Sequence, residues 1–92
     1  MTDLEITTLR AAVSVAAQHP HRVASASQIA AWLGNLLGNA KAPRVIDGAL
    51  SRLARHGLLT AAGNGPNGER LWSVPPGVTL AIIEALRPEA AP

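Results

Sequence analysis

Proline and glycine divide this chain into short segments, and no other feature of the sequence constrains its fold as strongly. Proline disfavours helical geometry at the residue before it, and glycine favours turns and helix ends. Most intervals between breaks suit one helix or one strand, and the interval from Pro20 to Gly38 suits a short strand followed by a helix. The uninterrupted apolar runs are only a few residues long, which excludes a transmembrane helix. The main breaks are Pro20, Gly38, Gly57, the stretch 63–69 and the stretch 75–77.

The composition predicts one small domain spanning residues 1–92, with a core over about residues 3–75. Hydrophobic residues make up 48% of the chain, which is enough for a compact core even though many of them are alanine. The absence of cysteine excludes disulfide scaffolds and zinc–thiolate sites. Because Asp3 and Glu5 stand where a signal peptide carries cations, we expect a cytoplasmic protein.

Apolar spacing and helix-cap signals predict a mostly helical chain with one β-hairpin. Thr2 and Glu5 have capping-box spacing, as do Ser25 and Gln28, and each pair precedes apolar residues at helical intervals. Two apolar runs flank the turn-rich stretch 63–69 and predict the hairpin. The predicted elements are a helix over 2–19, a short strand over 22–24, a helix over 25–37, a helix over 43–56, strands over 58–62 and 70–74, and a last helix at about 77–87.

This order of elements resembles the winged helix-turn-helix superfamily over roughly residues 5–75. The resemblance rests on Ser27-Gln28-Ile29-Ala30, on the spaced apolar residues Val45, Leu50 and Leu53 with the Gly57-Leu58-Leu59 that follows them, and on Leu71-Trp72. The chain looks like small bacterial transcription regulators of the MarR or PadR kind, without a ligand domain. The resemblance implies an α+β, mostly α, fold of three helices, a hairpin wing and a C-terminal helix, and it implies binding to double-stranded DNA. The stretch from Gly34 to Pro43 departs from the pattern, because it is longer than the usual tight turn.

The third predicted helix has one apolar side and one side rich in arginine. A projection at about 100° per residue places Arg44, Ser51 and Arg55 nearly opposite the apolar side, with Asp47 and Gly48 flanking them. Long cations and small residues in this arrangement suit a helix in the DNA major groove, although an ordinary solvent-exposed face is the alternative. For Asp47 we expect pairing with Arg44, and acceptance of a hydrogen bond from a cytosine amino group is the alternative. The apolar side consists of Val45, Ile46, Ala49, Leu50 and Leu53.

The charge distribution and the predicted hairpin indicate further DNA contacts. The formal net charge is +2, but residues 19–70 hold six Lys or Arg against two acids, which suits a polyanionic partner. Lys41, Arg52 and Arg70 are expected on phosphates, and Asn67 in the wing tip is either a contact or plain turn chemistry. Ser27 and Gln28 open a helix whose N-terminus can bind phosphate, although capping alone also explains this segment.

The last predicted helix is apolar on more than one face, and a chain of this size has little protein to bury it. It can pair with the first helix or with its copy in a second subunit. We expect a homodimer, with packing on the chain's own core as the alternative. The residues expected at the dimer contact are Leu9, Val78, Ile82, Ile83 and Leu86.

The sequence gives no indication of catalysis. It has no phosphate-binding glycine loop, its Ser and His residues lack triad spacing, and His19 and His21 have no further metal ligands near them. We therefore expect no enzyme, no cofactor and no metal. The expected function is that of a dimeric DNA-binding transcriptional regulator or an accessory factor of a plasmid or mobile element. The alternative is a winged-helix protein–protein adaptor that docks through its last helix.

Overall fold

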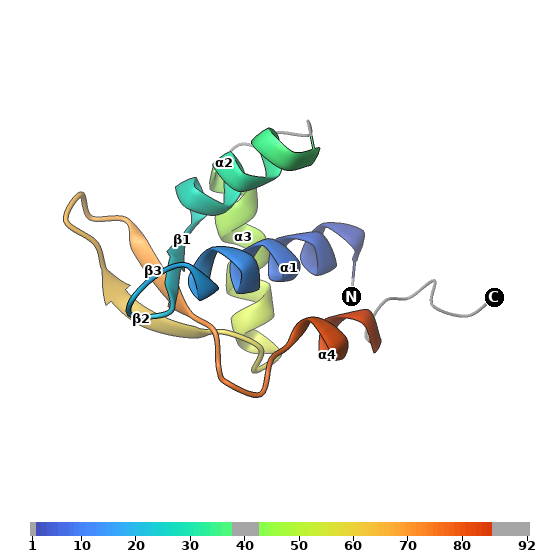
Figure 1. The fold of residues 1–92 in the computed structure, drawn as a ribbon. Coiled ribbons are helices and arrows are strands. Elements are labelled where there is room, and N and C mark those ends of the chain that lie inside the picture. The colour runs from blue at the N-terminus through green and yellow to red at the C-terminus, as the bar shows by residue number, and fades with distance from the viewer. Residues whose placement is uncertain (1, 38–42, 86–92) are drawn as a thin grey trace.

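The computed structural model describes residues 2–37 and 43–85. Over these residues the chain forms a small α+β fold, mostly helical, with four helices and a three-stranded antiparallel sheet. Figure 1 shows the sheet beside the helices, with the β2–β3 hairpin projecting away from them. The elements are α1 (Asp3–Ala17), β1 (Val23–Ser25), α2 (Ala26–Leu37), α3 (Pro43–Arg55), β2 (Thr60–Asn64), β3 (Arg70–Ser73) and α4 (Leu80–Ala85).

Both predicted capping boxes are present and set the starts of α1 and α2. The Glu5 backbone N–H donates to the Thr2 hydroxyl, and the Thr2 backbone N–H donates to the Glu5 carboxylate. Ser25 and Gln28 exchange the same two hydrogen bonds, at 3.2 and 3.0 Å. Each pair satisfies backbone donors that a helix N-terminus otherwise leaves without acceptors.

The C-terminus of α3 explains why β2 begins later than predicted. Gly57 adopts φ +78°, and the backbone N–H groups of Gly57 and Leu58 donate to the carbonyls of Ala54 and Leu53. This is the Schellman arrangement, in which an apolar residue after the glycine packs back on the helix. Leu58 is accordingly half-buried against the core and Leu59 is buried. The predicted strand over 58–62 is therefore wrong at its first two residues, because Leu58 and Leu59 follow the C-terminus of α3 and pack back on the core. The observed strand β2 begins at Thr60.

The sheet has the strand order β1–β3–β2, so the short strand after α1 pairs with the far strand of the hairpin. Ala24 lies opposite Trp72 on one side of β3, and Ala61 lies opposite Trp72 on the other. The pairing of β2 then shifts, because Asn64 lies opposite Arg70. One extra residue in β2 is therefore accommodated as a bulge, where Gly63 adopts φ +98°.

The core lies where α1, α2, α3 and the sheet meet. The structure corrects one predicted member of it, because Val45 is 43% exposed. The buried residues of α3 define a narrow stripe, and Val45 lies about 90° from its centre at 100° per residue. The larger buried side chains are Ile6, Leu9, Ile29, Leu33, Ile46, Leu50, Leu53, Leu59, Trp72, Val74 and Ile83.

Helix α4 packs on α1 within the same chain (Figure 1). Ile83 is fully buried, and Arg10 forms an ion pair with Glu84 at 3.4 Å between Nη1 and Oε1. Leu9 is also fully buried, so neither it nor Ile83 has surface to offer a second copy, in contrast to the expectation of a dimer contact. Val78 is half-buried against the core, and Ile82 remains 45% exposed. Leu86 lies outside the described residues.

Candidate nucleic-acid interface

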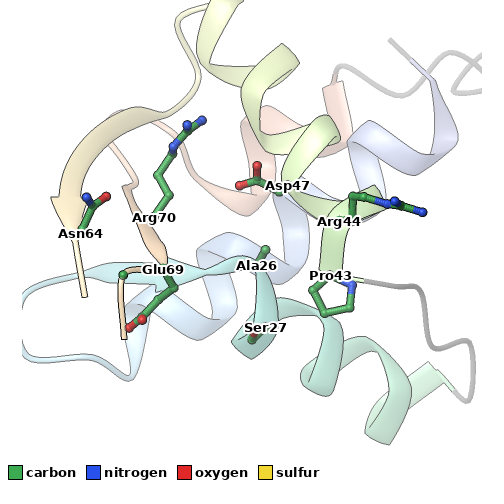
Figure 2. A pocket seen from close by; sticks show the side chains of 9 residues that line it. Ala26, Ser27, Pro43, Arg44, Asp47, Asn64, Glu69 and Arg70 are labelled. Carbon is green, nitrogen blue, oxygen red and sulfur yellow. The ribbon is translucent and has the colours of Figure 1, made fainter. Parts of the chain in front are cut away.

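A groove of about 440 Å³ separates the β2–β3 hairpin from the N-terminal ends of α2 and α3 (Figure 2). Asn64 and Arg70 come from the hairpin, and Arg44 and Asp47 come from the first turns of α3. The groove is lined mainly by polar and charged side chains, and it brings together segments far apart in the sequence. Its lining is therefore better suited to polar or charged groups than to an apolar ligand. Its lining residues are Ala26, Ser27, Pro43, Arg44, Asp47, Asn64, Gly68, Glu69 and Arg70.

The solvent-facing side of α3 continues from this groove. Arg44 and Arg55 are exposed, and Ser51 between them is half-buried. The side chains fully buried on the other side of the helix, Ile46, Leu50 and Leu53, fix this orientation. The three residues predicted to face outward on α3 therefore form one continuous strip, which we call the α3 face.

Arg52 lies at the edge of the α3 face that is turned toward α1. A side chain at Gly48 would meet the Arg52 guanidinium at 3.7 Å, so this side chain folds back along its own helix. Its charge also acts on Glu5 of α1. Arg52 is thus separated from the groove, which lies at the opposite edge of the α3 face, beside Asp47.

Glu5 is a buried carboxylate that joins the start of α1 to the end of α3. The backbone and side-chain hydrogen bonds from Thr2 hold the pKa of Glu5 below its ordinary value, although burial acts in the opposite direction. The positive charge of Arg52 and the nearby His56 lower this pKa further. His56 Nε2 lies 3.9 Å from Glu5 Oε2. Glu5 therefore stabilises the packing behind the α3 face rather than contributing to it.

Arg70 is the cation of the hairpin that lines the groove. Its guanidinium carbon lies 5.6 Å from the centroid of the Trp72 ring, which is buried beneath it. A cation over an aromatic face is attracted by the ring, so Trp72 helps to hold Arg70 in place. In Figure 2 Arg70 and Asp47 extend toward the same side of the groove, whereas Arg44 points away from both.

Glu69 is a residue of the groove that the sequence did not single out. Its carboxylate accepts a hydrogen bond from the backbone N–H of Asn67 at 3.0 Å, and its carbonyl accepts one from Gly65. The carboxylate also lies against Gly65, so a side chain at Gly65 would displace it. Glu69 thus fixes the tip of the hairpin, and the exposed Asn67 side chain is displayed by a closed turn. The sequence signal that could have identified Glu69 is its position directly after the Asn67-Gly68 turn and before Arg70.

The start of α2 holds the two remaining candidates that the structure describes. Ser27 is exposed and lines the groove, but Gln28, although exposed, is engaged in the capping box with Ser25. Ser27 is thus the better placed of the two for an anion at the helix N-terminus. Lys41, predicted to contact phosphate, lies outside the described residues.

Asp47 does not form the predicted pair with Arg44. Figure 2 shows the Arg44 side chain extended away from the Asp47 carboxylate. Within residues 2–37 and 43–85, Arg10 forms an ion pair with Glu84, and His56 forms one with Glu5 when its ring is protonated. In the same residues, Asp47 has no ion pair or hydrogen bond through its side chain. The spacing of three residues permits the pair but does not require it, because a long exposed side chain retains its rotamer freedom.

Within the described segments, no three His, Asp or Glu side chains gather in a way that could hold a metal ion. In that part of the chain no helix has both the length and the apolar character required to cross a bilayer. Comparisons with protein-family models, with curated proteins and with solved structures gave no match to this chain.

Proposed function

We propose that this chain is a winged helix-turn-helix protein that binds double-stranded DNA, as a small transcriptional regulator or as an accessory factor of a plasmid or mobile element. The order helix, strand, helix, helix, hairpin supports the winged-helix interpretation, and so does the pairing of β1 with β3. In such a fold the third helix serves recognition and the hairpin is the wing, as the sequence resemblance implied.

The observation that carries the proposal is the α3 face with the groove beside it. Arg44 and Arg55 are exposed on one side of a helix whose other side is fully buried, so the helix is anchored while its arginines remain free. Arg70 adds a third cation from the hairpin, across the groove. A helix that enters the major groove while a hairpin contacts the adjoining backbone requires cations at these two places.

Fluorescence anisotropy with a labelled mixed-sequence duplex tests this proposal. We expect binding at low salt, with an affinity that falls steeply as salt rises, because contacts to phosphates release counterions. Arg44→Ala and Arg55→Ala should each weaken binding, because these arginines are proposed to enter the major groove. Arg70→Ala should reduce the slope of log affinity against log salt by about 1, because Arg70 is proposed to contact a phosphate.

Arg10→Ala is the matched control for these variants. It removes one positive charge from α1, where Arg10 forms an exposed ion pair with Glu84 whose contribution to stability is small. A loss of affinity in Arg10→Ala equal to that in Arg44→Ala would contradict a specific role for α3. Absence of binding to any duplex at low salt would refute DNA binding altogether.

Homodimer formation remains a prediction, but fewer of the expected contact residues support it, because Leu9 and Ile83 are buried within the chain. The larger apolar side chains of α4 with substantial exposed surface are Leu80 and Ile82, at 50% and 45%. Light scattering after size exclusion should show a dimer that Ile82→Glu converts to a monomer. A wild-type monomer that binds no DNA would instead favour a protein–protein adaptor, which uses the same exposed pair on α4 to dock on a partner.

A further inference from the structure

The Asp47 carboxylate is a negative charge without a partner on the surface proposed to bind DNA. It lies one residue before Gly48, at the edge of the α3 face that borders the groove, and Arg70 of the hairpin also lines that groove. Among the described residues, neither an ion pair nor a side-chain hydrogen bond neutralises this charge. The residue thus repels the phosphates that the arginines around it attract.

A carboxylate at such a position weakens binding unless it accepts a hydrogen bond from the partner. Both of its oxygens only accept when ionised, and the phosphates and sugar oxygens of DNA offer it no donor. In the major groove the donors are the exocyclic amino groups of cytosine and adenine. Asp47 therefore has a favourable role in a DNA complex only against a base edge.

Cytosine is the base that fits an acceptor-only side chain. Adenine presents its N7 acceptor beside its amino donor, so it suits an amide that both donates and accepts. Guanine presents two acceptors, and thymine presents an acceptor and a methyl group. Cytosine presents its amino group without a neighbouring acceptor on the same base, and a carboxylate accepts from it without repulsion from that base.

The neighbours of Asp47 allow the close approach that its short side chain requires. Gly48 follows it, and a side chain at Gly48 would meet only the Arg52 guanidinium, so the protein's own packing does not require a glycine there. Ser51, one turn further along, is also small. Arg44 is extended away from this point (Figure 2) and leaves it uncovered.

We propose that Asp47 is a specificity-determining residue that accepts a hydrogen bond from the N4 amino group of a cytosine in the major groove. The inference rests on the proposed DNA binding and adds one defined preference to it, a C·G pair in one orientation at one position of the target. Asp47 then lowers the affinity for unrelated sequences and favours the sequence that supplies the donor.

Selection of bound duplexes from a random pool tests this role. The wild-type protein should enrich a site with cytosine at one position. Asp47→Ala should enrich the same site but accept any base at that position. Asp47→Asn should change the preferred base at that position toward adenine, which an amide recognises. Asp3→Asn is the control, because it removes an exposed acid on α1 instead. Thermal melting of each variant checks that the fold is retained.

The second measurement is the affinity for a duplex from which one amino group has been removed. Replacing the selected cytosine with pyrimidin-2-one, which lacks the amino group, should weaken wild-type binding by roughly 5- to 100-fold. It should weaken binding by Asp47→Ala much less, since that variant has no acceptor to lose.

The outcomes separate this inference from the proposed function. Two results would overturn the role of Asp47 and leave DNA binding intact. In the first, Asp47→Ala selects the same site as the wild-type protein, and in the second, the wild-type site contains no position that requires cytosine. Equal loss with pyrimidin-2-one in both proteins also overturns it. Absence of DNA binding by the wild-type protein refutes the proposed function, and the role of Asp47 with it.

Discussion

Replacement of Gly48 by alanine should stabilise the protein and weaken its binding to DNA. Glycine in a helix interior is about 0.8–1.0 kcal/mol less favourable than alanine, because its backbone loses more conformational entropy on folding. Gly48 lies within α3, and an added Cβ would be 3.7 Å from the nearest atom, Arg52 Nη1, which is ordinary van der Waals contact. With no steric penalty to subtract, the free energy of unfolding should rise by nearly the full amount, about 1 kcal/mol.

Thermal and urea unfolding followed by circular dichroism at 222 nm would measure this change. For a domain of this size, 1 kcal/mol corresponds to an increase in Tm of about 4–8 °C. The matched control is Gly57→Ala. A Cβ at Gly57 likewise meets no steric obstacle, with no atom within 4 Å, but the φ of Gly57 is +78°, so the same substitution should destabilise the protein by about 1 kcal/mol.

The two glycines therefore differ in backbone geometry and not in available space. If Gly48→Ala lowered the Tm, or if Gly57→Ala left it unchanged, the reasoning from helix propensity and backbone conformation would be refuted. If Gly48→Ala raised the Tm and left the affinity for a selected duplex unchanged, the α3 backbone would not approach the DNA closely at this point.

Three further predictions concern stability. Because the pKa of Glu5 is lowered in the folded state, Glu5 contributes stability that is present above its unfolded pKa of 4.5 and is lost as the pH falls through the lower folded value. Glu5→Gln should therefore flatten the loss of unfolding free energy below pH 4.5 in an acid titration. Ser25→Ala should lower the unfolding free energy by about 1 kcal/mol in urea, since the Gln28 N–H loses its acceptor, while Ser27→Ala should leave it nearly unchanged. Leu50→Ala should cost about 2–5 kcal/mol in the same assay, and a smaller loss would show that the core collapses around the missing side chain.

Local signals in the sequence predicted the starts of α1, α2 and α3 to within one residue, whereas α4 begins at Leu80, later than the predicted start at about residue 77. Ser25 and Gln28 predicted the start of α2, and Gly57 predicted the end of α3, because these features depend on backbone donors and acceptors within a few residues. The predicted helix over 43–56 matches α3 to one residue. Tertiary packing decided the rest, as at Leu58, which continues the helix exit instead of starting a strand.

The candidate site was only partly predictable for the same reason. The orientation of Arg44, Ser51 and Arg55 follows from helical geometry alone, and the structure places them on one strip. The groove depends on where the hairpin lies relative to α3, which periodicity does not encode. The separation of Asp47 from Arg44 depends on side-chain rotamers, and a spacing of three residues does not determine these.

The bulge in β2 separates the base of the hairpin, which packs on the core, from its tip, which projects beyond it (Figure 1). Opposed residues of antiparallel strands share a face, so Ala61 and Asn64 lie on the face of Trp72 and Arg70 although they are three positions apart. Removing one residue between them would make the two strands equal in length there, abolish the bulge and leave Asn64 opposite Arg70. Insertions of paired residues beyond the bulge would instead lengthen the hairpin and preserve its packing. The reach of this hairpin can therefore change without disturbing the core, provided that β2 and β3 are lengthened by the same number of residues.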